Sequence, residues 1–234
     1  MPVLVTQYHN VIEQSRRIWL PEFSRRWQQG EHIALIGPTG TGKTGLAADL
    51  LSARSYVVVF AIKRVDDTLK SFKGYKIIKR WPPDYDDKKL ILWVKPQSLG
   101  DIIKQRTAII QAMEEIHIAG GWCVYFDDLS YVCDQLRIKT PVVTFMNQGR
   151  ANGISAVNAT QRPSGVPRHA FNQTRHTIIY HYEDEDELVR AAQIAGIPRK
   201  HMIELNQQLQ VYPKGYSDYL SFGKNQIRLV RNVR

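Results

Sequence analysis

An eight-residue segment, GPTGTGKT at positions 37–44, restricts the fold more than any other part of this sequence. It matches the pattern GxxxxGK[ST] at every fixed position. The apolar stretch His32–Ile36 precedes it, and a helical pattern follows from Lys43 to about Ala53. A strand, a glycine-rich turn and a helix in this order form a phosphate-binding loop. We therefore predict an α/β fold in which this strand leads into such a loop.

The residue types of the loop suit the binding of a nucleoside triphosphate. Glycine allows backbone conformations closed to other residues, so that successive N–H groups can surround a phosphate at the positive end of the following helix. A lysine here reaches the β- and γ-phosphates, and a threonine hydroxyl can bind Mg²⁺. We expect ATP and Mg²⁺ as ligands, with Lys43 catalytic and Thr44 a metal ligand. The nucleotide-binding candidates are Gly37, Pro38, Thr39, Gly40, Thr41, Gly42, Lys43 and Thr44.

Two carboxylates follow a second apolar segment, Trp122–Phe126. Hydrolysis needs two distinct acids, because the metal neutralises one of them. We expect Asp127 to hold Mg²⁺ through water and Asp128 to polarise the attacking water as general base. Two acids after a strand are also common at helix caps, so this prediction depends on the loop upstream.

The rest of the chain alternates between β-branched segments and helical patterns, which predicts a mostly parallel central sheet flanked by helices. Residues 1–30 are interpreted as a helical lead-in, residues 31–205 as the core, and residues 206–234 as a short β and basic extension. The further strands expected are Tyr56–Ile62, Leu90–Val94, Ile154–Thr160 and His176–Tyr182. The further helices expected span residues 98–118, 129–149 with a break near Pro141, and 184–196.

The strand expected at Ile154–Thr160 ends in Gln161, whose amide could bridge a γ-phosphate and an attacking water. A polar residue leaving a strand is the simpler alternative. The loop, the Asp-Asp strand and the run RANGISAVNATQRPS at positions 150–164 together resemble the FtsK/HerA superfamily of DNA-pumping ATPases. The TQRPS part carries most of this resemblance, because P-loop proteins at large do not share it.

The resemblance implies a RecA-like core that works as a ring, usually a hexamer, threading double-stranded DNA. Gln161 matches the family's polar sensor position. Arg150 matches a basic position that can act as an arginine finger on a neighbour's nucleotide, with a role in capping or solvating a helix as the alternative. Further finger candidates are Arg162, Arg168 and Arg175.

The length of 234 residues leaves room for little beyond the core. The chain is therefore more similar to the small genome-packaging ATPases of certain viruses than to larger translocases. A portal, capsid or membrane protein would then have to select the DNA.

The charge favours a polyanionic partner, since the formal net charge is +10. Residues 141–182 contain four arginines and no carboxylate, which suits groups that meet a triphosphate between subunits. Solvated surface is the alternative for each basic segment. The candidate DNA contacts are Lys63, Arg64, Lys70, Lys73, Lys76, Lys79 and Arg80, then Arg137 and Lys139, then Lys224, Arg228, Arg231 and Arg234.

Two cysteines, Cys123 and Cys133, make neither a disulfide framework nor a zinc site. The apolar runs are shorter than the roughly 20 residues of a membrane helix. We expect a protein of the cytoplasm, or of the virion if it is viral. Two other functions stay open: a small-molecule kinase, and an assembly or secretion NTPase that acts on a protein partner without moving DNA.

Overall fold

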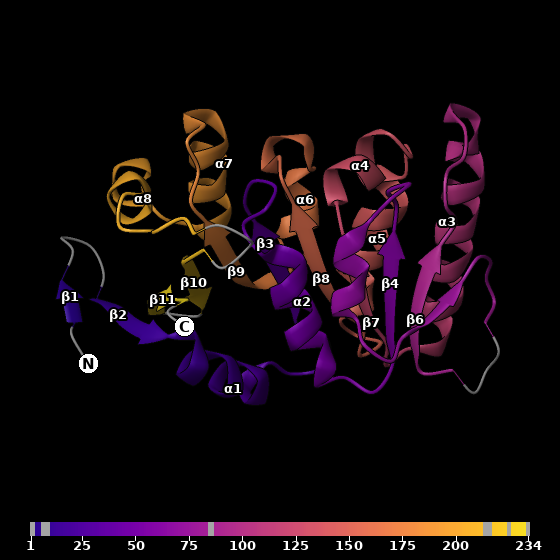
Figure 1. Ribbon diagram of the computed structural model, residues 1–234, viewed down its shortest axis with the longest axis horizontal. Helices are drawn as coiled ribbons and strands as arrows, with labels where there is room; N and C mark the ends of the chain where they lie inside the picture. Colours follow the sequence, from indigo (N-terminus) through magenta and orange to yellow (C-terminus); the bar gives the residue numbers. More distant parts are fainter. Residues whose placement is uncertain (1–2, 6–9, 84–86, 213–216, 224–225, 233–234) are drawn as a thin grey trace.

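The computed structural model describes residues 3–5, 10–83, 87–212, 217–223 and 226–232, which form an 11-stranded sheet with helices on both faces (Figure 1). The strand order is β1-β2-β11-β10-β9-β3-β8-β7-β4-β6-β5. Several neighbours in this order are far apart in the sequence, so the helices between them cross over the sheet, as in other parallel α/β folds.

Seven strands form the parallel part of the sheet, which confirms the predicted fold class. Strand β8 lies between β3, which leads into the glycine-rich loop, and β7, which ends before Asp127. The parallel strands are β3 (His32–Ile36), β4 (Val57–Ala61), β5 (Lys76–Ile78), β6 (Lys89–Trp93), β7 (Cys123–Phe126), β8 (Ser155–Thr160) and β9 (Thr174–Tyr180).

Side chains alternate across each central strand, and both faces are buried, as a parallel sheet with two helical layers requires. In β3, Ile33 and Leu35 pack with helices α1 (Arg16–Arg26) and α2 (Lys43–Ser52). Ala34 and Ile36 pack on the other face. The helices of that second layer are α3 (Ile102–Ala119), α4 (Leu129–Asp134), α5 (Lys139–Gly149), α6 (Arg168–Phe171), α7 (Glu185–Ala195) and α8 (Arg199–Asn206).

The two ends of the chain extend the sheet beyond β9. Strand β10 (Tyr219–Gly223) pairs antiparallel with β9, and β11 (Gln226–Arg231) pairs antiparallel with β10. Strand β2 (Asn10–Ser15) runs parallel to β11, with β1 (Val3–Val5) outside it. The sequence pattern predicts only a helix in residues 1–30, whereas two strands precede α1. Their pairing partners lie near the other end of the chain, so no local pattern indicated them.

The predicted helix over residues 129–149 is two helices, and the break precedes Pro141. Arg137 has a left-handed φ of 55° between α4 and α5. Pro141 lies in the first turn of α5, where its missing N–H group has no partner to lose. Short 3₁₀ helices are η1 (Asp67–Ser71), η2 (Leu99–Asp101) and η3 (Pro163–Gly165). In the described part of the chain, no helix has the length and apolarity needed to cross a membrane.

All seven parallel strands point the same way, so their last residues meet at one edge of the sheet, which we call the carboxyl edge. The glycine-rich loop, Asp127 and Gln161 follow β3, β7 and β8 there. The opposite edge, where these strands begin, is the amino edge. Because β3 has five residues, the two edges are roughly 16 Å apart.

Candidate active site

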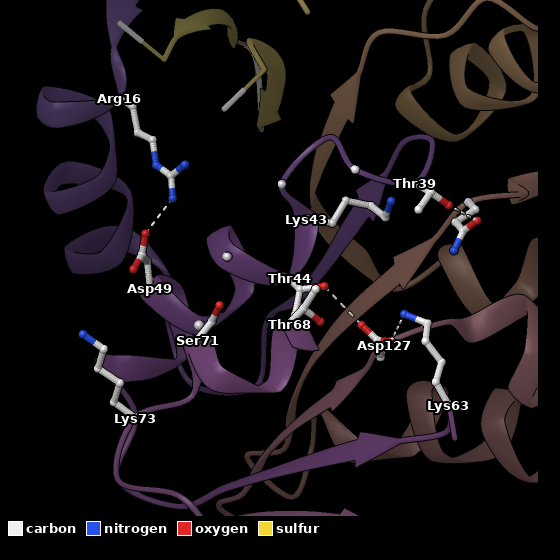
Figure 2. Close-up of a pocket in the computed structure, with 15 residues that line it drawn as sticks. Arg16, Thr39, Lys43, Thr44, Asp49, Lys63, Thr68, Ser71, Lys73 and Asp127 are labelled. Atoms are coloured by element: carbon white, nitrogen blue, oxygen red, sulfur yellow. Dashed lines mark hydrogen bonds and ion pairs between the residues drawn. The ribbon is translucent and has the colours of Figure 1, made fainter. Parts of the chain in front are cut away.

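A cleft of about 710 Å³ opens at the carboxyl edge, in front of the glycine-rich loop (Figure 2). Its walls come from the loop and the start of α2, from the ends of β4, β7 and β8, and from α1 and η1. A cleft at this end of the strands is the usual ligand site of open α/β sheets.

The three glycines of the loop serve different purposes. Gly40 and Gly42 have φ angles of 82° and 103°, in the left-handed region that favours glycine. Gly37 is required for packing, because a Cβ there would lie 2.7 Å from the Cβ of Tyr180. Gly42 is also the N-cap of α2 and has no side chain to cover the first backbone N–H groups. The start of α2 is therefore able to bind an anion.

Lys43 is buried and folds back over its own loop. Its ammonium donates to the carbonyl oxygens of Gly37 and Pro38, each at 2.7 Å. Burial lowers the pKa of Lys43 to about 8, although the carboxylates of Asp127 and Asp128 oppose the shift. The loop thus holds a cation where a phosphate would bind, and the carbonyl contacts keep it oriented.

The carboxylate of Asp127 contacts three side chains at the cleft. Its Oδ1 accepts from the Thr44 hydroxyl at 3.2 Å and from the Tyr125 hydroxyl at 3.1 Å. Its Oδ2 lies 2.6 Å from the ammonium of Lys63. The structure therefore brings together both residues predicted to bind the metal, and adds two partners that were not predicted.

Thr44 and Asp127 offer a hydroxyl and a carboxylate, the oxygen ligands that Mg²⁺ prefers. The described residues contain no group of three or more His, Cys, Asp or Glu side chains able to hold a metal by themselves. Mg²⁺ commonly takes only one or two protein ligands beside phosphate oxygens and water. The residues present fit a metal that is bound together with a nucleotide.

Asp128 caps the helix that follows β7. Its Oδ1 accepts from the backbone N–H and the hydroxyl of Ser130, at 3.1 and 2.6 Å, and from the N–H of Tyr131 at 3.4 Å. Among the described residues, Asp127 lines the cleft and Asp128 does not. Asp128 therefore caps α4, as the alternative interpretation predicted. Its role as general base stays a prediction, and the cap is compatible with it.

Gln161 faces the loop from the end of β8. Its side-chain oxygen accepts from the hydroxyl of Thr39 at 2.6 Å, and Tyr182 donates to its backbone carbonyl at 2.7 Å. Because β8 lies between β3 and β7, this amide is placed between the loop and the acidic strand. That position suits the predicted sensor role.

The candidate arginine fingers are divided between the two edges. Arg150 lies at the amino edge, where its carbonyl oxygen would be 3.0 Å from a Cβ at Gly30. Arg175 lies at the same edge, 3.6 Å from Glu31. Arg162 directly follows Gln161 at the carboxyl edge, and Arg168 begins α6; both side chains are exposed. Arg150 therefore cannot reach the loop of its own chain.

Several residues that line the cleft were not among the predicted nucleotide-site residues. Lys63 was assigned to a DNA-binding stretch, yet it contacts Asp127. Lys73 was assigned to the same stretch and also lines the cleft. Arg16 of α1 lies 2.6 Å from Asp49 of α2, at the far end of the cleft. Lys63 follows β4, the strand next to β7, at the edge where Asp127 lies, so finding it would have required the strand order.

The chain matches no protein-family model and no curated protein. Solved structures do resemble it. One is B204, the DNA-packaging ATPase from Sulfolobus Turreted Icosahedral Virus, with a TM-score of 0.63 and 16% identity over 89% of this chain and 100% of that one. Another is the genome packaging NTPase B204 from Sulfolobus turreted icosahedral virus 2 in complex with AMPPCP, with a TM-score of 0.61 and 15% identity over 88% and 100%.

A third similar structure is the cytoplasmic domain of the Type VII Secretion ATPase EccC from Thermomonospora curvata. Its TM-score is 0.55 at 14% identity, over 86% of this chain and 25% of that one. Identities this low establish the shared fold alone. The shared fold agrees with the fold that the motif resemblance implied.

Proposed function

We propose that this protein is an ATP-hydrolysing motor that moves double-stranded DNA as a ring, in the packaging of a viral genome. One observation carries the proposal: Lys43, Thr44, Asp127 and Gln161 meet at one cleft of a fold shared with genome-packaging ATPases. A related NTPase of this fold is known in complex with AMPPCP, a triphosphate analogue, which supports ATP as the ligand.

The residues of the cleft divide the reaction among them. The ammonium of Lys43 exchanges its carbonyl contacts for the β- and γ-phosphates. Thr44 and Asp127 would hold Mg²⁺, which when bound neutralises charge on the phosphate oxygens. Asp128 accepts a proton from the attacking water, and the Gln161 amide orients that water beside the γ-phosphate.

The position of Arg150 supports the proposed ring. In one chain this arginine and the loop lie at opposite edges of the sheet, roughly 16 Å apart by the length of β3. An arginine finger must contact the phosphates directly, so Arg150 can serve only a neighbouring subunit. We propose a hexamer, on the family resemblance.

The DNA is held through its phosphates, which needs exposed cations and little base reading. Of the basic stretch after β4, Lys63 and Lys73 line the cleft, and Lys70 and Lys76 are paired with Asp67 and Asp87. Lys139 is likewise paired with Asp134, and Arg228 is half-buried. The exposed candidates that remain for DNA are Arg64, Lys79, Arg80 and Arg137. In the C-terminal tail, Arg231 is bound to Glu13 and Asp218, while Lys224 and Arg234 lie outside the described residues.

A portal, capsid or membrane protein would supply the choice of DNA. The motor would then work in the host cytoplasm or on the virion.

The second candidate is a secretion or assembly NTPase that acts on a protein partner. The likeness to the Type VII Secretion ATPase favours it. It shares the nucleotide chemistry and differs in the substrate.

The deciding experiment is the ATPase rate of the assembled protein with and without double-stranded DNA. The motor is expected to be stimulated about tenfold or more, because coupling lets the substrate favour the reactive state. Heparin serves as the control for charge alone, and Lys43→Ala as the control for contaminating activity. A rate that DNA does not change, in a protein that hydrolyses ATP, would favour the secretion or assembly function.

A further inference from the structure

We propose that Lys63 is a positioning residue of the ATP site. Its ammonium holds Asp127 in this structure, and it would move to Asp66 when Asp127 is needed to hold Mg²⁺ beside ATP. The inference rests on the proposed function, because it requires that the cleft bind a nucleotide with a metal.

The first observation is the contact itself. The side chain of Asp127 is only 2% exposed, and Lys63 Nζ lies 2.6 Å from its Oδ2. Thr44 and Tyr125 occupy the other oxygen. Figure 2 shows Lys63 reaching Asp127 from the side opposite Thr44. A buried carboxylate needs a counter-charge, and Lys63 supplies it at the oxygen that Thr44 and Tyr125 leave open.

The second observation is an alternative acceptor for the same ammonium. The side chain of Asp66 is also 2% exposed, and its Oδ2 lies 3.6 Å from Lys63 Nζ. Its Oδ1 caps η1 by accepting from the backbone N–H of Thr68 at 3.0 Å. Among the described residues Oδ2 has no hydrogen-bond partner. Buried oxygens are rarely left unpaired, so Asp66 is a preformed second place for the ammonium.

The third observation is that the backbone here is held in place. The carbonyl of Ile62 accepts from the buried amide of Gln105 at 2.9 Å, and the carbonyl of Lys63 accepts from the indole of Trp93 at 2.8 Å. The side chain of Lys63 is 42% exposed and has room to turn. The exchange is therefore a movement of one side chain between two fixed carboxylates.

This arrangement makes the ammonium and Mg²⁺ competitors for Asp127. If Asp127 holds the metal, the ammonium of Lys63 would move to Asp66, which caps η1. Thr68 and Ser71 of η1 line the same cleft. The exchange thereby couples nucleotide binding to η1, which lies in the basic stretch that begins at Lys63.

The test measures how much Mg²⁺ is needed to bind a fluorescent, non-hydrolysable ATP analogue. Lys63→Gln removes the competitor and is expected to lower the half-saturating Mg²⁺ concentration about fivefold. Asp66→Asn keeps the cap of η1 through its amide oxygen but removes the second acceptor charge. It is expected to raise that concentration about threefold. In the double variant the Asp66 effect disappears, and the value equals that of Lys63→Gln.

Two outcomes would overturn the inference. One is weaker nucleotide binding by Lys63→Gln at saturating Mg²⁺, which would make Lys63 a phosphate ligand. The other is an Asp66→Asn change that raises the half-saturating Mg²⁺ concentration equally with Lys63 and with Gln at position 63. Such an effect would come from the lost charge of Asp66 alone. If wild-type protein binds no nucleotide at any Mg²⁺ concentration, the proposed function fails as well.

Lys63→Arg covers the case in which Lys63→Gln does not fold. Arginine keeps the charge and can hold a carboxylate by two hydrogen bonds, so the half-saturating Mg²⁺ concentration is expected to rise. An unchanged Mg²⁺ requirement in Lys63→Arg would contradict the exchange.

Discussion

The two edges of the sheet handle charge in different ways. At the carboxyl edge the charged groups Lys43 and Asp127 are buried and held by other residues of the same chain. At the amino edge Arg150 and Arg175 are exposed, and Arg175 has only a loose pair with Glu31. Burying charge is costly unless it is paired, so the buried charges of the first edge have their partners within one chain. The second is available to a neighbour.

The largest expected effect is at the carboxyl edge. Lys43→Ala removes the buried cation that would bind the β- and γ-phosphates, so ATP binding and turnover are expected to fall below detection. Calorimetric titration with ATP and a phosphate-release assay measure the two losses. Wild-type turnover in this variant would refute the assignment of the loop.

Arg150→Ala tests the amino edge. Loss of a finger that acts between subunits is expected to reduce turnover about 10³-fold, with ATP binding retained. Mixing variant and wild-type subunits should lower activity more steeply than the fraction of variant. The matched control is Arg106→Ala, an exposed arginine of α3. A loss that is linear in the fraction of variant would contradict the contrast between the edges.

Asp128→Asn separates chemistry from capping. Asparagine caps helices as well as aspartate does, so α4 and the fold should be kept. Hydrolysis is expected to fall about 10²-fold, because the side chain can no longer take a proton. Single-turnover hydrolysis and thermal unfolding measure the two properties. If both hydrolysis and the melting temperature were unchanged, Asp128 would not be the general base, and its role would be to cap α4.

The smallest effect is a pH dependence of binding. Burial lowers the pKa of free Lys43 to about 8, and phosphates stabilise its charged form. ATP affinity is therefore expected to be constant below pH 8 and to fall by up to about tenfold per pH unit above it. Lys43→Arg stays charged over that range, and its affinity should not change with pH. If the ATP affinity of the wild-type protein stayed constant up to pH 10, the lowered pKa of Lys43 would be contradicted.

The loop and its flanking strand and helix could be predicted from sequence because each depends on neighbouring residues. Asp127 and Gln161 could be added because parallel strands end at one edge. The contact of Lys63 with Asp127 depends on β4 lying next to β7. No local sequence pattern predicts the order of strands in a sheet. The same holds for β2, whose Val11 pairs with Ile227 near the other end of the chain.

The central claim is movement along double-stranded DNA, and displacement of a third strand measures it most directly. A short oligonucleotide bound as a triplex to one end of a duplex is released when a motor reaches it. We expect release with ATP and Mg²⁺, none with a non-hydrolysable analogue, and none with Lys43→Ala. Hydrolysis that is stimulated by the duplex but releases no third strand would contradict the motor.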